Sequence, residues 1–249
     1  MSGHSKWANI KHKKGRADAA RGKVFSKIAK EIIVAAAAGG GNLDDNIQLR
    51  ALVQKAKGVS MPKDNIDRAI KKGTGELDGG ALEQMVYEMY APGGVPMIVE
   101  ALTDNKNRAA SEIKNVLTKN GASLAQQGAV SRMFQRKGQI LISTEATDEE
   151  TLMDLVLEAG AEDMQREDDQ FEVLTAFGDY AAVANAITDA GIETVSSELT
   201  MIPDMPTNIA SKEQAQKLMK LVDLLEELDD VQDVYPGFEI DDSIVDDLD

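Results

Sequence analysis

The sequence predicts a mixed α+β fold, with a small helical bundle at the N terminus followed by two α/β-sandwich domains, at least one of them ferredoxin-like. Three observations lead to this prediction. Apolar residues recur at helical spacing up to Gly73, and they alternate along the chain after the glycine-rich segment 73–80. The segments between 139 and 202 then follow the order β-α-β-β-α-β. With 249 residues, the chain has room for two domains or three small ones.

The helical bundle is predicted from three short amphipathic segments. Their apolar stripes indicate helices over 23–38, 44–57 and 62–73. Asp44 or Asp45 is expected to cap the second helix, and Pro62 is typical of a first helical turn. Because the connections are only a few residues long, the three helices should pack against one another.

The first sheet is predicted to be built from two distant parts of the chain. Alternating patterns and a turn at 92–94 indicate strands over 85–90 and 96–102, with a helix at 106–120 and a further strand at 129–134. Near the C terminus, a helix at 211–228 and a strand at 231–235 have no sheet of their own. We therefore expect both to return to the first sheet, which makes that domain discontinuous.

The ferredoxin-like domain is predicted from the middle of the sequence. Strands are expected at 139–143, 162–166, 171–175 and 192–202, with helices at 148–159 and 179–190. The resulting domain limits are 1–78 for the helical bundle and the basic arm that precedes it (residues 1–22), 79–137 plus 205–249 for the discontinuous domain, and 138–204 for the ferredoxin-like domain.

Charge is divided unequally along the chain. Residues 1–72 hold 16 Lys or Arg against 6 Asp or Glu, whereas the whole protein has a net charge of −16. Such a basic N-terminal segment on an acidic protein indicates binding to a polyanion through that segment alone. The alternative is a solvated basic tail that balances an acidic body.

Composition excludes several other classes of protein. Without Cys, the chain has no thiol nucleophile and no Cys-ligated metal, and its two His residues both lie in the basic arm. General acid–base catalysis therefore has little support, and we expect a non-enzymatic protein without cofactor, metal or small-molecule substrate. No apolar run is long enough to span a membrane, and the basic arm is richer in lysine than a mitochondrial presequence, so a cytoplasmic location is expected.

Two groups of residues are predicted to bind nucleic acid. The first is the arm and the start of the first helix, namely Lys6, Trp7, Lys11, His12, Lys13, Lys14, Arg16, Arg21, Lys23 and Lys27. Lysines predominate, which favours contact with backbone phosphates over reading of bases. Trp7 either stacks on a base or anchors the arm to its own domain.

The second predicted group joins a strand to the start of a helix, at Asn105, Lys106, Asn107 and Arg108. Backbone N–H groups at a helix start, together with the helix dipole, form an anion site. The alternative for these residues is an ordinary capped helix with surface cations.

Several motifs, in order along nearly the whole chain, resemble those of the YebC family. They include Gly3–Trp7, Lys11–Lys14, Arg21–Lys27, Ala91–Gly94, Asp104–Arg108 and Met201–Pro203. The resemblance implies a three-domain, non-enzymatic cytoplasmic protein that regulates gene expression. Members are described as transcriptional regulators that bind promoter DNA, and also as ribosome-associated translation factors that help at difficult, proline-rich sequences. This chain departs from the family at Lys106, where arginine is frequent, and at Met133, where an aromatic residue is frequent.

The residues themselves leave the choice between promoter DNA and ribosomal RNA open. No helix presents Asn, Gln or Arg in an arrangement typical of base reading, which favours recognition of shape or backbone. A protein-interaction adaptor that uses the acidic domains is the alternative from a different functional class.

Overall fold

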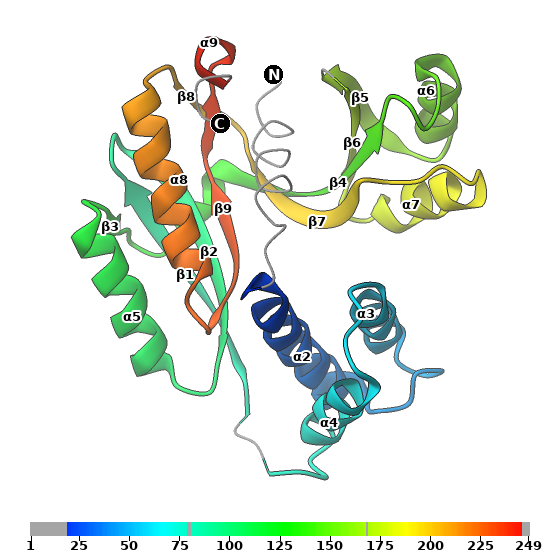
Figure 1. Ribbon diagram of the computed structural model, residues 1–249, viewed down its shortest axis with the longest axis vertical. Coiled ribbons are helices and arrows are strands. Elements are labelled where there is room, and N and C mark those ends of the chain that lie inside the picture. The colour runs from blue at the N-terminus through cyan, green and yellow to red at the C-terminus, as the bar shows by residue number, and fades with distance from the viewer. Residues whose placement is uncertain (1–18, 79–80, 168, 246–249) are drawn as a thin grey trace.

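The computed structural model describes residues 19–78, 81–167 and 169–245. Within them, three helices form the N-terminal bundle and two four-stranded antiparallel sheets follow, so the mixed α+β fold is confirmed. Figure 1 shows the bundle projecting from one end of a body formed by the two sheets.

The bundle consists of α2 (Ala19–Gly39), α3 (Ile47–Gly58) and α4 (Lys63–Gly73). Its core is filled by aliphatic side chains, including the fully buried Ile32 and Leu49. The first helix begins four residues earlier than the sequence predicted, and the third begins just after Pro62.

The predicted cap of the second helix is wrong, because Asn46 takes that position instead of Asp44 or Asp45. The side-chain oxygen of Asn46 accepts a hydrogen bond from the backbone N–H of Leu49 at 3.0 Å. Its amide nitrogen donates to the carbonyls of Ala35 and Gly40, so Asn46 joins both ends of the turn. A carboxylate cannot donate these two bonds, which explains why the helix starts after the amide.

The first sheet has the strand order β3-β1-β2-β9 and is antiparallel throughout. Its strands are β1 (Glu83–Ala91), β2 (Val95–Thr103), β3 (Ser123–Leu124) and β9 (Val231–Pro236). As expected, the C-terminal strand β9 returns to this sheet and pairs with β2. Helices α5 (Lys106–Lys119) and α8 (Lys212–Glu226) cover one face of it (Figure 1).

The strand predicted at 129–134 is wrong. This segment forms a turn and the short 3₁₀ helix η1 (Ser131–Met133). The buried carboxylate of Glu88 accepts the backbone N–H groups of Gly128, Val130 and Ser131 at 2.6, 2.5 and 2.8 Å. These donors are therefore unavailable to a strand ladder, and the next strand begins only at Phe134.

The second sheet has the strand order β5-β6-β4-β7, which is the order of a ferredoxin-like sandwich. Its strands are β4 (Phe134–Ser143), β5 (Ala161–Glu167), β6 (Gln170–Ala176) and β7 (Ser196–Pro203). Helices α6 (Glu149–Glu158) and α7 (Tyr180–Asp189) pack on one face around Ile140 and Val173. The domain limits stay a prediction, and β4 crosses the one placed between 137 and 138.

Three short elements near the C terminus were not predicted from the sequence. Strands β8 (Thr207–Ile209) and β10 (Phe238–Ile240) pair in parallel, and α9 (Asp242–Val245) follows them. Elements of three or four residues are too short to produce a recognisable periodicity.

Helices α2 and α4 lie close together at Gly73, where a Cβ would overlap the carbonyl oxygen of Ile33 and the Cβ of Ala36. We expect Gly73→Ala to lower the free energy of unfolding by about 1–3 kcal/mol, because the two helices must move apart. Urea denaturation followed by circular dichroism measures this. Gly58→Ala is the control, since Gly58 also ends a helix but has no atom near its missing Cβ. Equal stability of the two variants would contradict the close approach.

Candidate nucleic-acid interface

The basic arm contains most of the predicted nucleic-acid contacts, and most of it lies outside the described residues. This applies to Lys6, Trp7, Lys11, His12, Lys13, Lys14 and Arg16. Arg21 lies in α2, but its side chain is also outside the described part. The role of these residues stays a prediction.

Lys23, Lys27 and Lys30 form a stripe along α2, because residues spaced by four and three share one face of a helix. Lys23 Nζ donates to the carbonyl oxygen of Glu227 at 3.0 Å, and Lys27 Nζ donates to that of Gln232 at 2.9 Å. Glu227 caps the C terminus of α8, whose last turn contains no basic residue of its own. Lys23 thus places a positive charge at the negative end of that helix dipole. Lys23 and Lys27, which are predicted to contact phosphates, therefore attach the bundle to the first sheet.

The last lysine of the stripe, Lys30, binds Asp230, a buried carboxylate in the turn between α8 and β9. Its Oδ1 lies 2.8 Å from Lys30 Nζ, and its Oδ2 accepts from Arg108 Nη2 at 2.8 Å and from Thr103 Oγ1 at 2.9 Å. The Asp230 side chain is only 5% exposed, whereas that of Arg108 is 45% exposed. The carboxylate therefore joins the bundle, the end of β2 and the start of α5.

Burial on its own raises the pKa of Asp230. Hydrogen bonds from Lys30, Arg108 and Thr103 act in the opposite direction, and the pKa lies below its ordinary value as a result. The charged form is thus the one that the folded protein favours. Asp230 is ionised at neutral pH and binds both cations.

The four predicted residues at the start of α5 lie together and are exposed. Asn105 caps the helix by accepting the backbone N–H of Arg108 at 3.1 Å, and Lys106 pairs with Glu83 at 2.5 Å. Arg108 pairs with Asp104 as well as with the buried aspartate, while Asn107 is exposed. The protein's own side chains therefore occupy this helix start, which favours the capped-helix alternative. Phosphate binding here stays a prediction.

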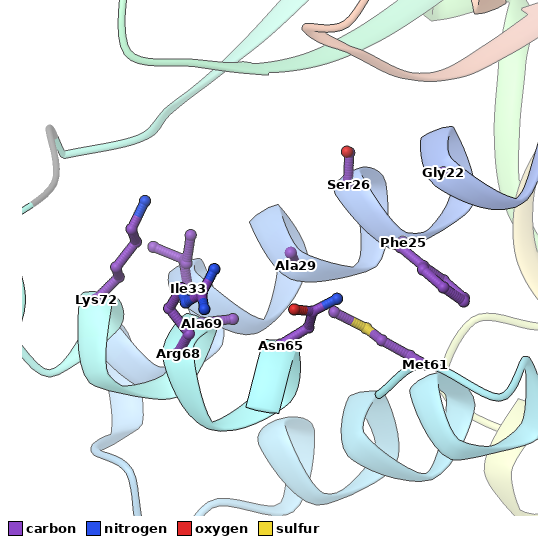
Figure 2. A pocket seen from close by; sticks show the side chains of 10 residues that line it. All are labelled: Gly22, Phe25, Ser26, Ala29, Ile33, Met61, Asn65, Arg68, Ala69 and Lys72. Atoms are coloured by element: carbon purple, nitrogen blue, oxygen red, sulfur yellow. The ribbon is translucent and has the colours of Figure 1, made fainter. Parts of the chain in front are cut away.

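A groove between α2 and α4 was not predicted from the sequence. Its volume is about 370 Å³, and Figure 2 shows it extending from Phe25 at one end to Lys72 at the other, with Ala29 and Asn65 between them. It is lined by Gly22, Phe25, Ser26, Ala29, Ile33, Met61, Asn65, Arg68, Ala69 and Lys72. In the part of the chain that the structure describes, the side chains of Asn65, Arg68 and Lys72 have no hydrogen bond or ion pair.

A signal for this groove was present in the sequence. Asn65, Arg68 and Lys72 are spaced by three and four residues, so they share one face of α4. On α2, small residues such as Ala29 leave space for the groove. The sequence does not show that this space faces α4, because that depends on how the two helices pack.

Within residues 19–78, 81–167 and 169–245, no three His, Cys, Asp or Glu side chains are grouped in a way that could hold a metal ion. None of the helices in this part of the chain is long and apolar enough to cross a membrane.

Asp230→Asn tests the junction between the bundle and the first sheet. We expect the free energy of unfolding to fall by about 2–3 kcal/mol, because hydrogen bonds to a charged, buried group are lost. Because the pKa of Asp230 is lowered in the folded state, its stabilisation is present at neutral pH and is lost as pH falls below roughly 4. Urea denaturation between pH 7 and pH 3 should therefore show a weaker acid dependence in the variant than in the wild type.

Asp104→Asn is the matched control, because Asp104 pairs with the same Arg108 but its side chain is 52% exposed. We expect a change below about 0.5 kcal/mol. A loss as large as that of Asp230→Asn would show that the buried carboxylate has no special role.

Comparison with known proteins gives full-length relatives. The chain is 51% identical to a protein of Syntrophobacter fumaroxidans over 246 residues, covering 99% of both chains, and 52% identical to one of Leptospira biflexa over 244 residues, covering 98% and 99%. Both relatives are named "Probable transcriptional regulatory protein". The crystal structure of a conserved hypothetical protein from Aquifex aeolicus has a TM-score of 0.84 and 45% identity, covering 95% of this chain and 97% of that one.

Two family profiles cover almost the whole sequence. Residues 5–76 match the "TACO1/YebC protein N-terminal domain", and residues 82–238 match the "TACO1/YebC second and third domain". The first match covers the arm and the bundle, and the second covers both sheets. The predicted resemblance is thus confirmed, and the chain belongs to the TACO1/YebC family.

Proposed function

We propose that this protein is a nucleic-acid-binding regulator of gene expression, and that it binds backbone phosphates through the arm and the helical bundle. The observation that supports the proposal most is the division of charge. Residues 1–72 carry a net charge of +10, whereas the protein as a whole carries −16. A polyanion is attracted to the first part and repelled by the rest.

The arrangement of the bundle supports this proposal. On α4 and at the end of α3, the cations Lys57, Lys63, Arg68, Lys71 and Lys72 have no intramolecular partner within the described residues. They lie on the part of the molecule that projects from the two-sheet body (Figure 1). A nucleic acid can therefore approach them without passing over the acidic domains.

The two groups of predicted contacts receive different roles in this proposal. The arm residues contact phosphates, because they precede the bundle and carry a higher density of positive charge than the bundle does. Lys23 and Lys27 hold the bundle on the first sheet, and Arg108 binds Asp230, the carboxylate that Lys30 of the bundle also binds. The orientation of the bound polyanion is thus set by the same side chains that join the two parts of the protein.

The target is either promoter DNA or ribosomal RNA, and both fit binding through the backbone. The names of the relatives favour a role in transcription regulation. The bundle lacks an arrangement suited to base reading in a major groove: α4 spans 11 residues and turns its Asn65–Arg68–Lys72 face toward α2. Recognition of shape is therefore the mechanism that we propose for either target.

A salt series with a DNA duplex and a structured RNA tests the proposal. If six cations contact phosphates, the logarithm of the duplex affinity should fall against the logarithm of salt concentration with a slope near −5. Removing residues 1–18, which contain five Lys or Arg, should reduce the slope to about −1. The tighter of the two ligands at physiological salt identifies the target.

Removal of residues 246–249 is the control, because it shortens the acidic end and leaves the arm intact. This variant should bind with the slope of the full chain. If the full chain binds neither ligand at low salt, the protein is instead an adaptor that works through its acidic domains. If removal of the arm leaves the slope unchanged, the contacts lie elsewhere.

A further inference from the structure

We propose that the groove between α2 and α4 holds one unpaired nucleotide of a folded RNA. This inference rests on the proposed function, since it gives a nucleic-acid-binding protein a specific contact. The groove has a volume of about 370 Å³, near the lower end of the roughly 300–1,000 Å³ that small-ligand pockets span. It is therefore suited to one small planar group.

One end of the groove is suited to a base. Phe25 and Met61 lie there (Figure 2). The small side chains of Ala29 and Ala69 take up little space in the rest of the groove. An aromatic ring offers a stacking surface to any base, and a thioether makes favourable contacts with aromatic rings. The apolar lining thus favours a flat, weakly polar group over a hydrated one.

Asn65 lies midway along the groove, between the apolar end and the cationic end (Figure 2). Its amide has both a donor and an acceptor, and neither has a partner among the described residues. The edge of a nucleobase presents the same pair of functions side by side. The amide is therefore placed to bind the edge of a base whose face lies on Phe25.

The opposite end of the groove is suited to a phosphate. Arg68 and Lys72 line it, both are exposed, and neither forms an ion pair within the described residues. In contrast, Lys23 and Lys30 on the other side of α2 donate to groups of the protein itself. A guanidinium and an ammonium next to an apolar pocket complement the backbone charge of the nucleotide whose base fills it.

The geometry favours RNA over duplex DNA and over an acidic peptide. A duplex keeps its bases stacked, whereas loops and bulges of folded RNA present unpaired bases that stack on aromatic side chains. An acidic helical peptide would fill a groove with several apolar anchors. Here an unpartnered amide lies in the middle of the apolar floor, and burying it against such anchors would leave it without a hydrogen bond.

Two RNA hairpins with the same stem test the proposal, one carrying a single 2-aminopurine bulge and the other fully paired. At a fixed salt concentration, the full-length wild type should bind the bulged hairpin about tenfold more tightly, which corresponds to one base stacked on an aromatic ring. Phe25→Leu and Asn65→Ala should each bring the two affinities close together. The fluorescence of 2-aminopurine should be quenched by the wild type and much less by Phe25→Leu.

Lys72→Ala and Lys71→Ala form the matched pair, because they remove the same charge from neighbouring positions and only Lys72 lines the groove. Lys72→Ala should reduce the preference for the bulge, and Lys71→Ala should preserve it. Thermal melting by circular dichroism shows whether each variant is folded. Because Asn65 and Lys72 lie outside the buried core, their variants remain informative even where Phe25→Leu lowers stability.

The outcomes separate this inference from the function on which it rests. If the wild type binds neither hairpin, the proposed nucleic-acid binding fails. If it binds both equally, or if Lys71→Ala acts like Lys72→Ala, only the nucleotide pocket is overturned. A bulged DNA hairpin bound as tightly as the bulged RNA would overturn the assignment to RNA, and displacement of the hairpin by an acidic helical peptide but not by free nucleotide would assign the groove to a protein partner.

Discussion

The buried carboxylate of Asp230 lies where the helical bundle meets the first sheet and the start of α5. It binds Lys30 from the bundle, Arg108 from the start of α5 and Thr103 from the end of β2. A buried charge is costly to leave unpaired, so this arrangement is stable only when all three partners are in place. The position of the bundle on the first sheet therefore depends on this side chain as well as on the bonds that Lys23 and Lys27 form.

This junction changes how the basic N terminus should be understood. Charge counting treats every lysine as available to a polyanion, but Lys23 and Lys27 are hydrogen-bonded to main-chain carbonyls of the acidic part of the chain. The same positive charges thus serve to hold an acidic body in place. What remains for a ligand, within the described residues, lies on α3 and α4, where Arg68 and Lys72 are exposed and have no intramolecular partner.

Much of the fold could be predicted, because it follows from local patterns. The ferredoxin-like order required only alternating and helical periodicity. The return of β9 to the first sheet could be predicted because the sequence offers no other sheet with which this strand could pair. The errors arose where a side chain replaced a backbone partner. Asn46 caps α3 because it also donates to α2, and Glu88 accepts the N–H groups of Gly128, Val130 and Ser131, at least 40 residues away. No local pattern encodes such distant bonds.

The candidate site was harder to predict than the fold, for a related reason. Spacing places Lys23 and Lys27 on one face of a helix, but it does not tell whether that face meets solvent or carbonyl groups. The same spacing rule puts Asn65 and Lys72 on one face of α4, but only the packed structure shows that α2 opposite them has the small residue Ala29 and leaves a groove.

Helix α2 connects these observations, because its three faces have three different environments. Ile28 and Ile32 point into the bundle core, the lysine stripe meets the first sheet, and Phe25 and Ala29 line the groove. At 3.6 residues per turn these sets occupy separate sectors of one helix, so none can be rotated without displacing the others. A ligand in the groove is consequently held at a fixed angle to the acidic body. Repulsion from that body then limits the directions in which the rest of a polyanion can leave the groove.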